Sequence, residues 1–461
     1  MAFPGETGLL FVAAALFTAS IHSLGVLETS IAPVVTAHSA VHVAADPHDP
    51  GTAPGLVMTG GRTTLADLAG SRGRPYLDDL VSLAPDTLAA ADRDDRVVAT
   101  AMDDPPAPAT VATWWSGLRG ADQTRLEQDA PVVVGNLEGV PYAVRGRANR
   151  AVLDAGLRDP HAEASRVAML GQVRDALVQE ATGARRSLIT LDTRGAGRAA
   201  IAIGDLDTAA DVTVVVPGMF FTVTGQMADF TNTANTLWGE QATLAPVAAP
   251  AAGTGVAVVA WMGYRTPDLS NILSLDLARS GAVRLERAVG GLREVRDGAQ
   301  PRLGIVAHSY GSTTALMALA SGRMSADSLT VLGSPGSDVR NASDLAVAAG
   351  QVFVGGAHWD PVAGSGYFGT DPGSAGFGST VLDLAGGVDP EDAGDAFRRP
   401  VGHNDYLKPG TASLHDVALI AVGRGDLVRD GVRHGGGRGD GVVQASPDMY
   451  LVRPQDLQPR D

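Results

Sequence analysis

The sequence of 461 residues contains no cysteine. This absence excludes a disulfide framework, a thiolate nucleophile, cysteine-ligated zinc and a lipid-modified cysteine, and it leaves the redox compartment open. A surplus of basic residues is also absent, because 35 Lys and Arg stand against 51 Asp and Glu, for a formal net charge of −16 and a pI of about 5.0. Such a chain repels phosphate backbones and anionic surfaces, so we expect no nucleic-acid partner.

Basic residues are missing from the first seven positions too, which contain Glu6 and neither Lys nor Arg. The stretch from Gly8 to Leu27 that follows is uncharged, mainly apolar and long enough to span a bilayer. The positive n-region and the clear cleavage site of a secretory signal are both lacking. Two interpretations of residues 1–45 therefore stay open. One is membrane association or export through this segment; the other is a packed or loosely attached helix in a cytoplasmic protein.

Residues 46–185 are predicted to form a linker and a helical region. Proline and glycine mark residues 46–62 as the linker. The apolar spacing around Trp114 and Trp115 predicts a helix that stops at Gly120, and we interpret the tryptophan pair as a packing anchor. A single long helix is predicted from His161 to Thr182. Its apolar face carries Val167, Leu170, Val173, Leu177 and Val178.

The pattern changes after about Ser187 to short apolar runs that alternate with helical or turn-rich segments. "SLITLDT" and "RAAIAIGD" predict a leading hairpin. The later runs are continuously apolar, which predicts a mainly parallel sheet covered by helices on both faces. We therefore predict a three-layer α/β domain over residues 186–425. Residues 426–461 are rich in Gly, Arg and Asp, a composition typical of a disordered tail.

One predicted strand-to-helix junction carries "AHSYG", with Ser309 at its centre. The five residues resemble G-x-S-x-G, the nucleophile elbow, with Ala307 in the first glycine position. Small residues are required at both ends because the tight turn brings them against neighbouring backbone. The alternative is an ordinary serine where a strand ends. A second match, "AGSRG" around Ser71, has no predicted strand before it and is interpreted as a flexible loop.

A serine nucleophile requires a histidine that accepts its proton and an acid that orients this histidine. In chain order the acid comes before the histidine, each on a loop at the carboxyl end of a strand. Asp360 ends the apolar run "QVFVGGAHWD" and is the candidate acid, although Asp before Pro is also a common turn former. His403 lies in a loop before the last predicted helix and is the candidate base. The rival acids are Asp338, Asp371 and Asp383, and the other histidines beyond Ser309 are His358, His415 and His434.

Two backbone N–H groups are expected to stabilise an oxyanion at such a site. One is the N–H of Tyr310, directly after the serine. The other is expected from the loop after the strand in "VTVVVPGMFF", at Met219 or Phe220, although a plain Pro-Gly turn is the alternative there. Close to a second strand end lie three large apolar residues that either line an acyl pocket or belong to the core: Trp261, Met262 and Tyr264.

Several blocks of sequence occur in a characteristic order. They are "DVTVVVPG", "AVVAWMGYRTP", "AHSYGSTTALMAL", "TVLGSPGSDV", "VFVGGAHWDPVA", "FGTDPGSAGFGS" and "GHNDYL" with "TASLHDVALIAVG", after the helical "WWSGLRGADQTRLEQDAPVVVGNLEGVPYAVRGRANRAVL". Over about residues 110–425 they resemble an actinobacterial α/β-hydrolase domain family of unknown function. The resemblance implies the α/β-hydrolase fold and a triad of Ser309, Asp360 and His403. Ala307 departs from the glycine that is common there, and no substrate is implied.

The sequence therefore predicts a serine hydrolase that cleaves an ester or thioester of a small-molecule acyl substrate through an acyl-enzyme on Ser309, with no metal or organic cofactor. A peptidase or amidase on the same fold is one alternative. A non-catalytic, envelope-associated scaffold is the other, and it predicts either that the three side chains lie apart or that the pocket is blocked. The helical region is expected to cover the site or to dock elsewhere. Acyl length, leaving group and oligomeric state are left open.

Overall fold

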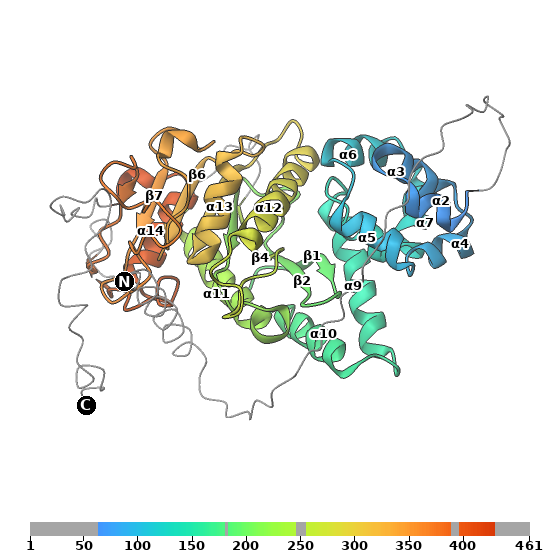
Figure 1. Ribbon diagram of the computed structural model, residues 1–461, viewed down its shortest axis with the longest axis horizontal. Coiled ribbons are helices and arrows are strands. Elements are labelled where there is room, and N and C mark those ends of the chain that lie inside the picture. The colour runs from blue at the N-terminus through green and yellow to red at the C-terminus, as the bar shows by residue number, and fades with distance from the viewer. Residues whose placement is uncertain (1–62, 180–182, 246–254, 389–395, 429–461) are drawn as a thin grey trace, which may run out of the picture.

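The computed structural model describes residues 63–179, 183–245, 255–388 and 396–428 (Figure 1). The apolar segment 8–27, the linker 46–62 and the tail beyond residue 428 lie outside the described residues, so the predictions for them stay predictions. Within the ranges above, no helix combines the length and the apolar character that crossing a membrane requires.

The N-terminal part of the described chain is helical, as predicted. Trp114 and Trp115 are both buried and meet edge to face, with ring centroids 5.9 Å apart, so the pair does act as a packing anchor. The predicted stop at Gly120 is wrong, because the helix that carries the pair ends at Ser116 and Gly120 begins the next one. The helices are α2 (Leu65–Gly70), α3 (Gly73–Ser82), α4 (Pro85–Ala91), α5 (Asp95–Asp103), α6 (Pro108–Ser116), α7 (Gly120–Asp129), α8 (Pro131–Val134), α9 (Tyr142–Arg158) and α10 (Ala164–Ala176).

Helix α10 is shorter than the predicted helix from His161 to Thr182. Leu170 and Val173 are buried in the core as expected, but Val167 is 39% exposed and Val178 is 64% exposed. Val178 lies beyond the last turn of α10, so it does not continue the buried face of the helix. The prediction of one uniform apolar face is therefore wrong at both ends.

The rest of the chain is built on a mainly parallel sheet in the order β1-β2-β4-β3-β5-β6-β7-β8. The pairs β1–β2 and β2–β4 are antiparallel, which confirms the predicted leading hairpin, and the other neighbouring pairs are parallel. The strands are β1 (Arg186–Asp192), β2 (Arg198–Ile203), β3 (Asp211–Val216), β4 (Val256–Met262), β5 (Arg302–His308), β6 (Ser328–Leu332), β7 (Val352–Gly355) and β8 (Thr380–Val381). A separate short pair, β9 (Gly387–Val388) and β10 (Ala396–Phe397), was not predicted.

Helices cover both faces of the sheet, which confirms the three-layer prediction (Figure 1). Alternate residues of a strand point to opposite faces, and in β4 Val259 and Trp261 pack on one side while Val258 and Ala260 pack on the other. Helices α12 (Asp276–Val295) and α13 (Tyr310–Ala320) cover the first face. Helices α10, α11 (Val223–Leu244) and α14 (Ala412–Ala421) cover the second. Two short 3-10 turns, η1 (Ala342–Asp344) and η2 (Gly425–Leu427), complete the described elements.

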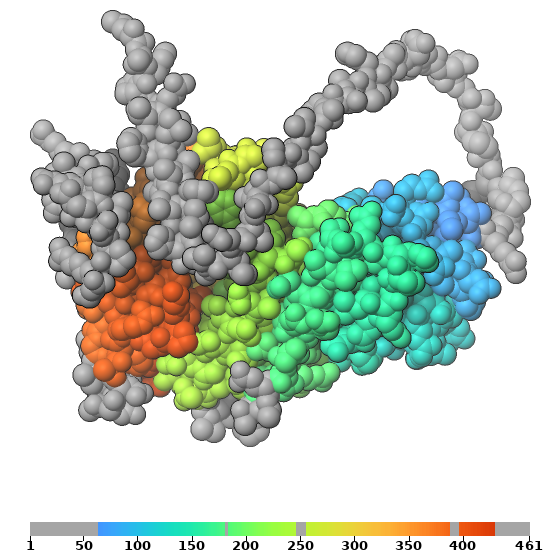
Figure 2. Space-filling view, turned by 90° about the horizontal axis from the view of Figure 1, so that it is seen from below, coloured from blue at the N-terminus to red at the C-terminus, as the bar shows by residue number. Residues whose placement is uncertain are grey.

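The helical region docks against the β1 edge of the sheet and against α12, and Figure 2 shows the two parts in continuous contact. Asn136 exchanges two hydrogen bonds of 3.0 Å with the backbone of Leu191, so this strand edge is protected from pairing with another chain. Arg284 of α12 donates to the carbonyl oxygen of Met102 at 2.9 Å and pairs with Asp103 at 3.0 Å. In Figure 1 β7 and α14 lie at the opposite end of the molecule from these helices.

Candidate active site

The parallel strands bring several loops to one edge of the sheet, because parallel strands all end at the same side. Ser309 lies on that edge, between β5 and α13, with φ 56° and ψ −130°. Among the described non-glycine residues, positive φ occurs at Ser309 and Phe220 alone, and each such residue costs about 1–3 kcal/mol of strain. A β-carbon at Gly311 would lie 2.4 Å from the carbonyl oxygen of Pro217, which explains why the turn requires a small residue there.

The hydroxyl of Ser309 is buried and, within the described part of the chain, has no hydrogen-bond partner. The residue as a whole is 1% exposed. Buried hydroxyl groups normally find a partner, because an unpaired one forfeits its hydrogen bonds to water. The Ser309 hydroxyl on this strained turn therefore keeps its capacity to form a hydrogen bond with a bound molecule.

His403 and Asp360 are brought together behind the elbow. The Nδ1 atom of His403 lies 2.9 Å from Oδ1 and 3.0 Å from Oδ2 of Asp360, and both side chains are buried. A carboxylate accepts hydrogen bonds, so Nδ1 carries a proton, and in the neutral form of the ring Nε2 presents a lone pair. Nε2 is buried without a partner among the described residues. This is the tautomer that a general base requires.

Asp360 is held as a carboxylate by its surroundings. It accepts hydrogen bonds from the Tyr406 hydroxyl at 2.5 Å and from the Val362 N–H at 2.8 Å. Burial acts to raise the pKa of Asp360, but the charge and hydrogen bond of His403 and the hydrogen bond of Tyr406 outweigh it and keep the pKa below its ordinary value. Tyr406 in turn accepts from the Ala357 N–H at 2.7 Å, and burial raises its pKa well above the usual range. The phenol therefore stays a hydrogen-bond donor.

A second histidine supports the site from within the elbow motif. His308 lies 2.6 Å from the carbonyl oxygen of His403 through its Nε2 atom, and the two rings are 4.5 Å apart. The carbonyl can only accept, so Nε2 of His308 carries a proton. Burial, followed by the neighbouring His403, lowers the pKa of His308 to about 3, which keeps this ring neutral. The contact places His403 beside the residue that precedes Ser309.

The sequence analysis did not single out His308 or Tyr406. Both stand next to motifs that it used, His308 in "AHSYG" and Tyr406 in "GHNDYL". The available signal was a polar aromatic residue directly before the predicted nucleophile and another three residues after the predicted base. Their partners lie 95 and 46 residues away along the chain, so the hydrogen bonds themselves could not be predicted.

The two expected oxyanion donors also lie at this edge. The Phe220 N–H donates to the carbonyl oxygen of Pro267 at 3.0 Å, so it is already used. The N–H groups of Met219 and Tyr310 have no acceptor among the described residues. Tyr310 opens α13, where helix N–H groups lack partners within the helix. A β-carbon at Gly218, the neighbour of Met219, would lie 3.1 Å from Ser309 Oγ, so this loop passes directly beside the serine.

The rival residues lie in other environments. Asp371 and Asp383 accept backbone N–H groups two residues further on, from Gly373 at 2.9 Å and Ala385 at 3.0 Å, as turn formers do. His415 lies 2.9 Å from Glu240 through Nδ1. Asp338 and His358 are exposed, and His434 lies outside the described residues.

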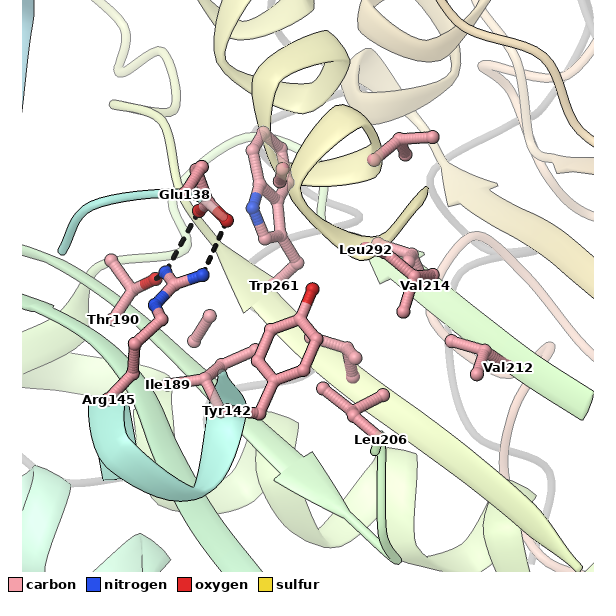
Figure 3. Close-up of a pocket in the computed structure, with 14 residues that line it drawn as sticks. Glu138, Tyr142, Arg145, Ile189, Thr190, Leu206, Val212, Val214, Trp261 and Leu292 are labelled. Atoms are coloured by element: carbon pink, nitrogen blue, oxygen red, sulfur yellow. Dashed lines mark hydrogen bonds and ion pairs between the residues drawn. The ribbon is translucent and has the colours of Figure 1, made fainter. Parts of the chain in front are cut away.

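The apolar residues near Ser309 are not the three that the sequence analysis considered. Trp261 lines a cavity between the helical region and the sheet, beside the ion pair of Glu138 and Arg145 (Figure 3). Tyr264 stacks on Trp261 at 5.8 Å, and both belong to the core on the α12 face. Met262 packs in the core of the other face. The core alternative therefore holds for all three side chains.

A separate apolar cluster lies at the carboxyl edge. Met219, Ile272 and Val362 are buried against one another, with Phe220 packed beside them. Met219 follows the glycine that touches Ser309, and Val362 donates its N–H to Asp360. The backbone that carries Met219 and Val362 therefore adjoins both the elbow and the candidate acid, and we call this cluster, together with residues 265–275 that carry Ile272, the apolar cover.

Comparison with known proteins found a matching family model, uncharacterized relatives and similar solved structures. A family model described as alpha/beta hydrolase matches residues 192–370, a range that includes Ser309 and Asp360 and ends before His403. The uncharacterized protein MT2140 of Mycobacterium tuberculosis (strain CDC 1551 / Oshkosh) is 32% identical over 396 residues, 71% of this chain and 58% of that relative, so the chain spans less than two thirds of its length. The uncharacterized protein Mb0988c of Mycobacterium bovis is 32% identical over 230 residues, 49% of this chain and 83% of the relative. Among solved structures, carboxyl esterase 2 of Tuber melanosporum is 11% identical, with a TM-score of 0.32 over 61% of this chain and 98% of its own.

Proposed function

Because the chain belongs to the α/β-hydrolase family, we propose that it is a serine hydrolase that cleaves an ester or thioester through an acyl-enzyme on Ser309. One observation carries the proposal. A strained serine with a buried hydroxyl lies at the same edge of the sheet as a histidine whose Nδ1–H is held by a buried carboxylate. His308, the residue before Ser309, contacts this histidine, while Ser309 Oγ and His403 Nε2 form no hydrogen bond with each other or with another described residue.

In the proposed reaction Ser309 Oγ attacks the acyl carbonyl carbon while His403 Nε2 accepts the hydroxyl proton. Asp360 stabilises the imidazolium that forms, and the N–H groups of Met219 and Tyr310 stabilise the oxyanion. The tetrahedral intermediate collapses, and His403 returns the proton to the leaving alcohol or thiol. Water then attacks the acyl-enzyme, with His403 again as base, and releases the acid and the free serine.

His308 and Tyr406 act as positioning residues in this proposal. The hydrogen bond from His308 holds the backbone of His403, and a neutral His308 does not repel the imidazolium that forms 4.5 Å away. The hydrogen bond from Tyr406 holds Asp360 in the orientation that receives Nδ1–H.

The direct test is labelling of the purified protein with a fluorophosphonate carrying its reporter on a polar linker. We expect the wild type to be labelled and Ser309→Ala to be unlabelled. Ser71→Ala is the matched control, since Ser71 stands in the same five-residue pattern, and it should be labelled like the wild type. A folded wild type that takes up no label would overturn the proposal.

One observation favours the scaffold alternative. Ser309 Oγ and His403 Nε2 are both inaccessible to solvent in this structure, so the site is closed. The labelling experiment separates the two proposals, because a permanently closed site excludes the probe. If the label is taken up, comparison of a p-nitrophenyl ester with the matching p-nitroanilide distinguishes an esterase from an amidase.

A further inference from the structure

The apolar cover of the elbow is attached to the elements that carry the proposed chemistry. Three hydrogen bonds join residues 264–267 to the loop after β3. Tyr264 donates to Pro217 O at 2.7 Å, Thr266 donates to Phe221 O at 2.7 Å, and Phe220 N–H donates to Pro267 O at 3.0 Å. These hydrogen bonds attach the first residues of the cover to the loop that contains Met219.

The far end of the cover is attached to the residue after the nucleophile. The hydroxyl of Tyr310 donates to Ser274 O at 2.6 Å and accepts the Ala278 N–H at 3.0 Å. Residues 265–275 thus bridge the site from the loop after β3 to the start of α12. A group that reaches the buried Ser309 Oγ requires surrounding side chains to move, and the loop beneath this bridge adjoins Ser309 at Gly218.

The side chains that such a group meets are aliphatic. Met219, Ile272 and Val362 carry no charge, and the ion pair of Arg265 with Asp268 on the bridge is exposed. The buried pair of Asp360 with His403 contacts this cluster through the backbone N–H of Val362. Displacing this cluster exposes apolar surface unless the entering group is itself apolar. A polar or anionic acyl group gains nothing there, and the net charge of −16 also disfavours anions.

We propose that Met219, Ile272 and Val362 form the acyl-binding face of the Ser309 site, so that its substrates are neutral esters or thioesters of medium-length or long aliphatic acids. This inference rests on the proposed function and names the substrate class for it. When the alkyl chain binds, its contacts replace those that the three side chains make with one another. Binding of the chain thereby opens the cover.

The bridge supplies its own control residue. Ile272 points inward and is 2% exposed, whereas Leu269, three positions earlier, is 50% exposed. We expect kcat/KM of the wild type for p-nitrophenyl octanoate to exceed that for the acetate by at least about tenfold, since each methylene in an apolar pocket changes discrimination strongly. Ile272→Ser should lower this octanoate-to-acetate ratio about tenfold, and Leu269→Ser should leave it within about twofold. Circular dichroism melting of each variant, with Ile272→Ala as a milder change, verifies folding.

A binding measurement that needs no turnover separates the two proposals. Calorimetric titration of Ser309→Ala with methyl octanoate and with methyl acetate should show binding of methyl octanoate alone, weakened by the added Ile272→Ser change. If the wild type takes no fluorophosphonate label but methyl octanoate binds, the proposed function fails while the aliphatic site stands. If the label is taken up but acetate is the better ester, or if Ile272→Ser changes both esters equally, the aliphatic site is refuted and the hydrolase stands.

Discussion

Two regions of the molecule bury polar side chains, and they differ in whether these side chains have hydrogen-bond partners. At the junction of the helical region with the sheet, every guanidinium nitrogen of Arg145 has an acceptor, supplied by Glu138, Thr190 and the Gly135 carbonyl (Figure 3). At the carboxyl edge, Ser309 Oγ and His403 Nε2 are buried without partners among the described residues. Satisfied polar groups stabilise a junction, whereas unsatisfied ones are available to a substrate.

The same difference separates the two matches to the serine motif. Ser71 follows α2 with extended backbone and donates its hydroxyl to Asp79 at 2.6 Å. Ser309 has a left-handed φ of 56°, and its hydroxyl has no hydrogen-bond partner in the part of the chain that the structure describes. Five similar residues therefore lead to a helix end in one region and to a candidate nucleophile in the other. The difference comes from strand β5, which precedes Ser309 and fixes the direction in which the backbone enters the turn.

The largest expected effect is at the acid of the carboxyl edge. Asp360→Asn should lower kcat roughly 10⁴-fold, because an amide no longer holds His403 in the tautomer with a free Nε2. The protein should still fold, as the side chain is nearly isosteric. Steady-state hydrolysis of a p-nitrophenyl ester measures the loss. Asp371→Asn, at the rival carboxylate, is the control and should stay within about threefold of the wild type. Equal losses in the two variants would contradict the assignment of Asp360.

Removal of a buried carboxylate at the junction of the helical region with the sheet should lower stability and leave the reactivity of Ser309 unchanged. Glu138→Ala leaves the buried guanidinium of Arg145 without its carboxylate and should lower the free energy of unfolding by about 3–5 kcal/mol. Urea unfolding measures this change, and fluorophosphonate labelling of the folded fraction should match the wild type.

The control for the junction is Glu127→Ala, which breaks the solvent-facing pair of Glu127 with Arg147. This variant should cost about 0–1 kcal/mol, because exposed ion pairs contribute little. If Glu138→Ala abolishes labelling while leaving stability unchanged, the division of the molecule into a structural and a reactive region is wrong.

A smaller effect is expected at Tyr406. Tyr406→Phe removes one hydrogen bond to the Asp360 carboxylate and should lower kcat by about tenfold or more, with little change in KM, because a hydrogen bond to a charged group contributes about 1.5–3 kcal/mol. Tyr367→Phe is the matched control, since the Tyr367 ring packs on Phe368 away from the acid. An unchanged kcat in Tyr406→Phe would show that Asp360 is held without the phenol.

The smallest effect at neutral pH is expected for substitution of His308. This substitution changes the free energy of unfolding, and the change becomes larger as the pH falls. Burial lowers the pKa of His308 from about 6.5 to about 3, so the unfolded chain binds this proton more readily than the folded one. The stabilising contribution of the neutral ring is complete above pH 6.5 and is lost as the pH falls toward 3. His308→Gln should therefore weaken the loss of stability between pH 6.5 and pH 4.

Carboxylates with shifted pKa values also affect the stability curve and set the design of the measurement. Asp360, with its lowered pKa, loses its own contribution only below its ordinary value of about 4. Burial raises the pKa of Asp92 to about 6, which acts in the opposite direction, so the difference between wild type and variant is the informative curve. His358→Gln, at an exposed histidine, should reproduce the wild-type curve. Parallel curves for the wild type and His308→Gln would rule out this contribution.

Much of the fold could be predicted from periodicity. Continuous apolar runs separated by helical segments predict a covered, mainly parallel sheet, and the structure has one. The prediction fails where a pattern does not reveal which face another element covers. In α10, Val167 continues the apolar spacing yet is 39% exposed, because only part of that face is covered.

The candidate site, like the fold, could be predicted from local signals only in part. Chain order and strand ends are local signals, and they suffice to nominate Ser309, Asp360 and His403, whose roles as a triad stay predictions. The acyl-lining residues could not be predicted this way. Trp261 lies at a strand end, but its side of the strand faces α12 and the helical region instead of the carboxyl edge.

By itself the sequence determined the order of the elements and the short junction at Ser309, because backbone preferences and strand or helix periods depend on near neighbours. Only the tertiary structure decided which groups pair across the loops. It engages Phe220 N–H with Pro267 and leaves Met219 N–H open, and it brings Ile272 against Val362. These contacts join segments that are far apart along the chain, and their geometry exists only once the sheet has aligned the ends of its strands.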